Sequence, residues 1–197
     1  MSVWDIADNS FLATNGIMQD FDEGAATASN LERGANHLGG DLLLNYNPSS
    51  DLASDSMEAS GDILSFLIGT NHSENARVVG LAVFAAKMEG RTLHVAGFSQ
   101  GAASTAAGVR LAAAATLGGL SNIDVTLKAG PINNQLARSA FMRAGIDVQG
   151  RAHLSGRNSD AVYTILGFNS INPVSWARSI VMAPCLAIDS CSPHVDR

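Results

Sequence analysis

A serine with a glycine two residues before it and another two residues after it stands near the middle of the chain. Residues 91–103 read RTLHVAGFSQGAA, in which a short β-type run ends at Gly97 and an alanine-rich helical pattern follows Ser99. A G-x-S-x-G motif between a strand and a helix predicts a tight turn, in which only small residues fit at Gly97 and Gly101. Such a turn raises the serine hydroxyl above the sheet at a helix N-terminus, where backbone N–H groups and the helix dipole favour developing negative charge. The segment therefore predicts that Ser99 is the nucleophile of a serine hydrolase.

The second requirement of this chemistry is a base, because a serine hydroxyl is a poor nucleophile near neutral pH until its proton is accepted. Two histidines follow Ser99 in the sequence. His153 lies inside a strand pattern, which is typical of a packed or surface histidine, whereas His194 follows Pro193 in a loop late in the chain. We expect His194 to be the base; the alternative is a terminal histidine without a role.

The third requirement is a carboxylate that orients the base. Asp160 follows the last predicted strand and is the preferred acid, with Asp189 as the reserve. Asp124 and Asp147 stand at the beginnings of predicted strands, which is the wrong end of the sheet. The alternative for Asp160 is a turn aspartate that caps a helix beginning at Ala161.

Backbone donors must also stabilise the oxyanion of an attacked carbonyl group, and each contributes about 3 to 4 kcal/mol to the transition state. The N–H of Gln100, directly after the nucleophile, is the first expected donor. The second is expected from Gly16 or Ile17, because this turn follows an apolar strand at residues 11–14 and precedes a helical pattern. The alternative is an ordinary strand-to-helix turn that needs a glycine for its backbone conformation.

Strand and helix patterns alternate along the whole chain. Strands are expected at residues 11–14, 41–46, 92–96, 123–128 and 146–154, and helices at residues 18–38, 73–88, 102–117 and 133–144, with one or two short helices over residues 52–68. The stretch at residues 52–68 could form a lid, an acyl-binding wall or ordinary core packing. No repeat or linker interrupts the pattern, so we expect one domain over residues 1–197.

This alternation predicts an α/β fold with a mainly parallel sheet of about five or six strands and helices on both faces. Right-handed crossovers place the strand near residue 42 outside that near residue 11, followed by those near 93, 125 and 148. The strand order reverses beside the strand that leads to Ser99, and such a switch point is where parallel sheets bind ligands.

Composition excludes several classes of protein. A net charge of −6 and a hydrophobic content of 46% describe a well-buried globule without the basic surface that nucleic acid requires. No apolar stretch reaches membrane-spanning length, and the first residues lack the pattern of a secretory signal. Cys185 and Cys191 could form a small loop disulfide or stay as free thiols, and they are too few for a zinc site. We expect neither a metal nor a cofactor.

The motif GFSQGAA at residues 97–103 resembles the elbow of cutinases, which are small esterases of the α/β-hydrolase superfamily. Two features depart from the cutinase pattern: no cysteine flanks Asp160, and His194 follows that aspartate later than the cutinase histidine does. The chain is also similar to lipase-like domains at the C-termini of large bacterial secreted or toxin polypeptides. There an N-G-I turn, a Y-N-P segment and the elbow occur in this order, here at residues 15–17, 46–48 and 97–101.

These resemblances imply a minimal α/β-hydrolase fold and a carboxylic-ester hydrolase, an esterase or a lipase, with phospholipases included. They imply a small-molecule or lipid ester as substrate, transient contact with a membrane surface, and delivery by a larger bacterial polypeptide. The alternative function is a domain that keeps the hydrolase fold without catalysis and binds a lipid or a protein partner.

Overall fold

The computed structural model describes residues 6–16, 19–37, 39–48, 52–69 and 72–156, together with Tyr163, Thr164, Gly167, Asn169, Val174 and Ala177. The side chains of residues 52–56 and 58 are outside this description. The elements in chain order are β1 (Ser10–Thr14), α1 (Phe21–Gly34), β2 (Leu42–Asn45), α2 (Leu52–Ile68), α3 (Glu74–Glu89), β3 (Leu93–Phe98), α4 (Gln100–Ala115), β4 (Ile123–Lys128), α5 (Asn134–Ala144) and β5 (Ala152–Ser155).

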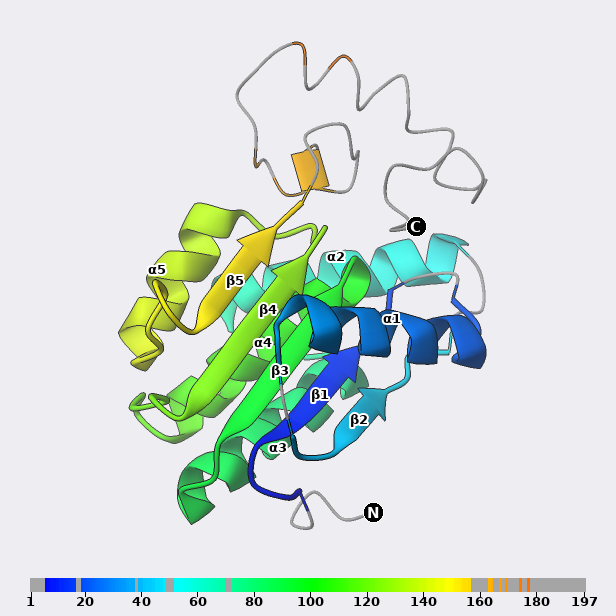
Figure 1. Cartoon of the computed structure of the whole chain (residues 1–197). Coiled ribbons are helices and arrows are strands. Elements are labelled where there is room, and N and C mark those ends of the chain that lie inside the picture. The colour runs from blue at the N-terminus through cyan, green and yellow to red at the C-terminus, as the bar shows by residue number, and fades with distance from the viewer. Residues whose placement is uncertain are drawn as a thin grey trace.

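The strands form one five-stranded sheet in the order β2-β1-β3-β4-β5, and every neighbouring pair is parallel. The predicted α/β class and strand order are both confirmed. Helix α1 lies against one face of the sheet, and α3 and α4 lie against the other (Figure 1). Because the strand order turns back between β1 and β3, the loops after these two strands diverge at the carboxyl edge of the sheet.

Local sequence signals place most helix ends correctly. Helix α3 begins after Ser73, whose side chain accepts from the N–H of Ala76, and it ends at Gly90 in the left-handed conformation. Helix α5 begins after Asn133, and Gly145 ends it in the same way. Side-chain caps at the first turn and a glycine after the last turn satisfy backbone groups that a helix leaves unpaired at its ends.

Several expected boundaries differ from the structure. Helix α1 ends at Gly34 instead of residue 38, α4 spans Gln100–Ala115 instead of residues 102–117, and β3 extends to Phe98 instead of residue 96. Helix α1 begins at Phe21 instead of residue 18, because Asp20 and Glu23 form a capping box. The last strand was expected over residues 146–154, but β5 spans only Ala152–Ser155. A turn precedes it, in which the carboxylate of Asp147 accepts from the N–H of Gln149. Residues 52–68 form one helix, α2, in place of one or two short ones.

The larger part of the core lies between the sheet and helices α3, α4 and α5. Helix α4 is buried along most of its length because alanines and glycines face the sheet and the neighbouring helix. A Cβ atom at Gly80 of α3 would lie 2.9 Å from the side chain of Leu111, and one at Gly108 of α4 would lie 2.7 Å from the Cβ of Val79. These two glycines therefore let α3 and α4 approach closely, which fixes the position of α4.

The opposite face of the sheet has a smaller apolar cluster under α1. His94 of β3 is part of this face: its ring stacks on Phe11 with centroids 4.5 Å apart, and its Nε2 lies 2.8 Å from the hydroxyl oxygen of Thr126. Burial, assisted by the neighbouring His37 and His153, lowers the pKa of His94 from 6.5 to about 3. The imidazole is consequently neutral in the folded protein near neutral pH.

This titration predicts a pH dependence of stability. Below pH 6.5 the unfolded chain binds a proton at His94 and the folded chain does not, so the stabilisation is complete above that pH and is lost as the pH falls toward 3. Between pH 6 and pH 5 the group should remove up to about 1.4 kcal/mol of the free energy of unfolding. Urea unfolding at a series of pH values measures the effect in the wild type and in His94→Gln. The free energy of unfolding should fall less steeply with decreasing pH in the variant, and the two curves should be parallel above pH 7.5. Equal slopes below pH 6 would contradict this role.

Candidate active site

Ser99 occupies a strained turn between β3 and α4. Its backbone has φ 55° and ψ −125°, in a region that residues with a Cβ atom rarely adopt. Ser99 stands at the N-cap position of α4, yet its side chain makes no capping hydrogen bond. Its hydroxyl has no hydrogen-bond partner among the described residues, so the usual structural use of an N-cap serine is absent there. The geometry is that of the predicted strand–turn–helix elbow.

The glycines on either side of Ser99 are required by close backbone contacts. A Cβ atom at Gly97 would overlap the carbonyl oxygen of Gly101, and one at Gly101 would overlap the carbonyl oxygens of Thr14 and Asn15. The first turn of α4 thus lies directly against the end of β1. The expectation that only the smallest residues fit these two positions agrees with the observed backbone.

Gln100 offers an unused donor beside the nucleophile. Its backbone N–H opens α4 and is not bonded to any group in the described part of the chain, as is usual for the first N–H groups of a helix. Its side chain is only 1% exposed, and neither the Nε2 nor the Oε1 atom has a hydrogen-bond partner there. The N–H of Gln100 therefore meets one requirement of an oxyanion-binding group.

The loop after β1 touches the elbow. A Cβ atom on Gly16 would lie 2.9 Å from the Cβ of Ser99, so the loop backbone lies next to the nucleophile. The N–H of Gly16 donates to the Oε1 of Gln19 at 2.9 Å, and the Nε2 of Gln19 donates to the hydroxyl of Thr27 at 2.7 Å. Gln19 therefore joins the loop to α1 and occupies the N–H of Gly16. Ile17, the other expected donor, lies outside the described residues.

A second set of hydrogen bonds fixes the same loop from the side of β2. The buried amide of Asn15 donates to the carbonyl oxygen of Asn47 at 3.1 Å and accepts from its N–H at 2.6 Å. The hydroxyl of Tyr46 donates to the carbonyl oxygen of Gln19 at 3.4 Å. Asn15 and Gly16 of the first sequence motif thus come together with the motifs at residues 46–48 and 97–101 at one edge of the sheet.

The histidines of the described part of the chain do not supply a base for Ser99. His37 and His94 bond to the carbonyl oxygen of Asn9 and to Thr126 instead. His153 is exposed on β5, and no hydrogen bond joins His72 to the serine. The chain has five histidines, and the fifth, His194, lies outside the described residues, so its predicted role is not tested.

Both candidate acids, Asp160 and Asp189, also lie outside the described residues, as do Cys185 and Cys191. The residues that flank the segment 157–162 are described and touch each other, since a Cβ atom on Gly156 would overlap the ring of Tyr163. The hydroxyl of Tyr163 accepts a hydrogen bond of 2.8 Å from the side chain of Asn134, which follows β4 at the carboxyl edge.

Asp124 and Asp147 lie away from this edge of the sheet. Asp124 is the second residue of β4, near the amino end of the strand. Burial raises the pKa of the Asp124 carboxyl above its ordinary value, although Arg151, 3.6 Å away, acts in the opposite direction. Asp147 belongs to the turn before β5. Neither carboxylate forms a hydrogen bond with a histidine in the described ranges.

No group of three or more His, Cys, Asp or Glu side chains is arranged to hold a metal ion in the part of the chain that the structure describes. Within the described ranges, no helix has both the length and the apolar character needed to cross a membrane.

Gln19, Thr27 and the Asn15–Asn47 pair were not identified from the sequence. The capping box at Asp20 and Glu23 is a sequence signal for the start of α1, and it places Gln19 at the end of the preceding loop. The partners of Gln19 and Asn15 could not be read in this way, since Asn47 comes 32 residues after Asn15.

Comparison of the sequence with protein-family models and with curated proteins gave no match. The α/β fold is shown by the structure itself, and the relationship to α/β-hydrolases that the motifs indicate stays a prediction.

The close contact at Gly101 predicts a large effect of one methyl group. Gly101→Ala should lower the free energy of unfolding by about 1 to 3 kcal/mol, because the added Cβ atom forces α4 away from β1. The matched control is Gly61→Ala in the middle of α2, where an added Cβ atom meets nothing within 4 Å. That control should be neutral or stabilising by up to about 1 kcal/mol, because alanine has the higher helix propensity. Chemical denaturation measures both, and a Gly101→Ala protein as stable as the control would contradict the contact.

Proposed function

We propose that this protein is a carboxylic-ester hydrolase of the serine type, with Ser99 as its nucleophile. The observation that carries the proposal is the strained backbone of Ser99 at the switch point of the sheet, with a hydroxyl that caps no helix. Positive φ at a residue other than glycine needs support from its surroundings, and such positions concentrate at functional sites. Beside it stands the N–H of Gln100, which has no partner in the described part of the chain and lies where charge would develop.

In the proposed reaction the hydroxyl oxygen of Ser99 attacks the carbonyl carbon of the ester while His194 accepts the hydroxyl proton. The tetrahedral oxyanion accepts hydrogen bonds from the N–H of Gln100 and of Ile17, since Gln19 occupies that of Gly16. Collapse breaks the ester C–O bond, and the proton on His194 passes to the leaving alkoxide. Water then attacks the acyl carbon while His194 accepts its proton. Collapse breaks the bond to the Ser99 oxygen, which takes the proton from His194, and the carboxylic acid leaves; Asp160 orients the imidazole throughout.

The proposed substrate is a small or lipid ester, and phospholipid acyl esters are included. Apolar side chains exposed on α2 support this choice, since Met57 is 77% and Leu64 is 53% exposed. Scattered exposed apolar groups are common on protein surfaces, so they do not define an acyl chain length. Rates of hydrolysis of p-nitrophenyl esters of increasing chain length, and of phosphatidylcholine, measure that preference. Transient contact with a membrane surface and a larger bacterial parent polypeptide belong to the same proposal.

A serine-reactive probe tests the nucleophile directly. A fluorophosphonate should label the protein stoichiometrically at Ser99, and Ser99→Ala should abolish labelling while the fold is retained. Hydrolysis of p-nitrophenyl butyrate by that variant should fall by roughly three orders of magnitude or more. Ser139→Ala, on α5, is the control and should label like the wild type.

Hydrolysis by Ser99→Ala at the wild-type rate would end the proposal. Absence of labelling in the folded wild type would favour instead a domain that binds a lipid or a protein without catalysis.

Gln19 should act as a positioning residue for the oxyanion loop. Gln19→Ala removes the acceptor of the Gly16 N–H and the bond to Thr27, so the loop is held less firmly against Ser99. We expect kcat for p-nitrophenyl butyrate to fall by about tenfold or more with KM nearly unchanged, because the loss concerns the transition state. Gln149→Ala, exposed in the turn before β5, is the control. A higher kcat in Gln19→Ala would contradict positioning and would indicate that Gln19 obstructs a donor.

A further inference from the structure

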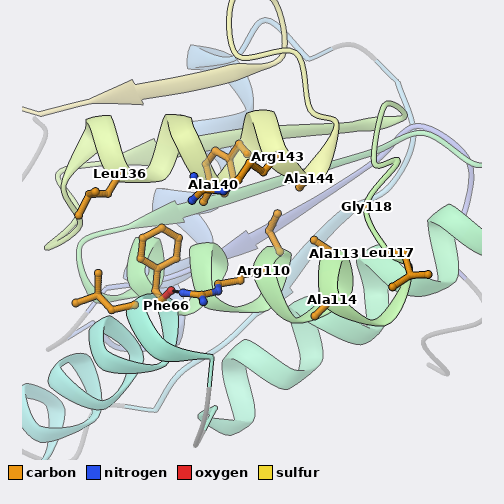
Figure 2. A pocket seen from close by; sticks show the side chains of 13 residues that line it. Phe66, Arg110, Ala113, Ala114, Leu117, Gly118, Leu136, Ala140, Arg143 and Ala144 are labelled. Carbon is orange, nitrogen blue, oxygen red and sulfur yellow. Dashed lines mark hydrogen bonds between the residues drawn. The ribbon is translucent and has the colours of Figure 1, made fainter.

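A cavity of about 440 Å³ opens in the helical layer, between the end of α2, the second half of α4 and α5 (Figure 2). This volume is within the range of about 300–1,000 Å³ that small-molecule sites occupy. The first residue of α4 that lines the cavity is Val109, more than two helical turns past Ser99. The last one, Ala114, lies about 20 Å from Ser99 along the helix axis. The cavity is therefore separate from the candidate active site.

The sequence explains why a cavity forms here. Helices α4 and α5 face each other across small side chains, Ala113 and Ala114 on one and Ala140 and Ala144 on the other, and these leave space that larger residues would fill. The buried ring of Phe141 lies at the inner side, while Leu117 and Leu136 at the rim are 97% and 51% exposed.

The charges at the cavity have one sign. Arg110 and Arg143 are the charged side chains that line it, and no Asp or Glu is among the described lining residues, although the whole chain has a net charge of −6. Arg110 extends from α4 to the carbonyl oxygen of Phe66 at the end of α2, to which its Nη1 donates. This contact uses one of five guanidinium N–H groups. Arg143, in the last turn of α5, has no ion pair or hydrogen bond from its side chain in the described ranges.

We propose that this cavity binds an anionic amphiphile of the fatty-acid type. The acyl chain would lie along the alanine-lined space between α4 and α5, and the carboxylate would bind Arg143 with support from Arg110. An apolar cavity with a few convergent polar groups is the usual composition of a ligand site, and the guanidinium group fits a carboxylate with two parallel hydrogen bonds. Among the described lining residues, a chain with a cationic head would find no acidic partner.

Titration calorimetry on Ser99→Ala tests the proposal without a contribution from turnover. The probes are laurate and dodecyltrimethylammonium below their micellar concentrations, which have the same chain length and opposite charge. Laurate should bind with one-to-one stoichiometry, and dodecyltrimethylammonium at least about tenfold more weakly, because a charge-assisted hydrogen bond is lost and like charges repel.

Variants locate the binding. In the Ser99→Ala background, Arg143→Gln should weaken laurate binding by about tenfold or more, and Ala140→Phe should abolish it by filling the space. Leu136→Glu adds a negative charge at the exposed rim without changing the core, and it should weaken laurate binding by repulsion. It replaces Ala140→Phe as the test if that variant does not fold. Leu81→Glu is the matched control, since Leu81 is 52% exposed on α3 and does not line the cavity.

Laurate binding that none of these cavity variants alters, or no binding at all, would overturn the proposal, as would equal binding of the cationic probe. Sedimentation velocity tests whether a second copy of the chain covers the cavity. A dimer that Leu136→Glu dissociates and Leu81→Glu does not would assign the cavity to a second copy of the chain and would also overturn it.

Discussion

The contact on which the rest of the structure depends is the one between the first turn of α4 and the end of β1. Gly101 lies against the carbonyl oxygens of Thr14 and Asn15, and Gly97 lies against that of Gly101. With no side chain at either glycine, the strand can turn into the helix within one residue. That residue is Ser99, and its positive φ is the conformational cost of the turn.

Packing away from the site maintains this strained turn. Helix α4 is held against α3 through the close approach at Gly80 and Gly108, and against the sheet through alanines that are fully buried. Each buried valine or leucine around it contributes about 1.5 to 3 kcal/mol relative to exposure, so the core outweighs a local strain of about 1 to 3 kcal/mol. The rigidity of α4 thus positions both the serine and the N–H of Gln100 at the start of the helix.

The two ends of α4 have different surroundings, although small residues stand at both. At its beginning the helix touches β1 and the loop held by Gln19 and Asn15, where backbone contacts leave no space. At its other end the same kind of small side chain, alanine, faces α5 across a gap, and a cavity results. Small residues therefore produce both a close backbone contact and a cavity on one helix.

Local patterns in the sequence determined the strand and helix elements, the strand order and the elbow at Ser99. Caps such as Ser73 and Gly90 act over three or four residues, and right-handed crossovers leave few possible strand orders. The start of β5 is predicted too early, because the turn at Asp147 interrupts an apolar run that resembles a strand.

Tertiary structure decided the features that need contacts between distant parts of the chain. The side chain of Gln19 could have pointed in many directions, and only the position of Thr27 on α1 directs it to the N–H of Gly16. The bond of Asn15 to Asn47 and the cavity beside Arg143 depend in the same way on how helices and loops pack. Residue types and short spacings determine which local geometry is possible, whereas the neighbours that satisfy a polar group or leave a space are determined by the packed fold.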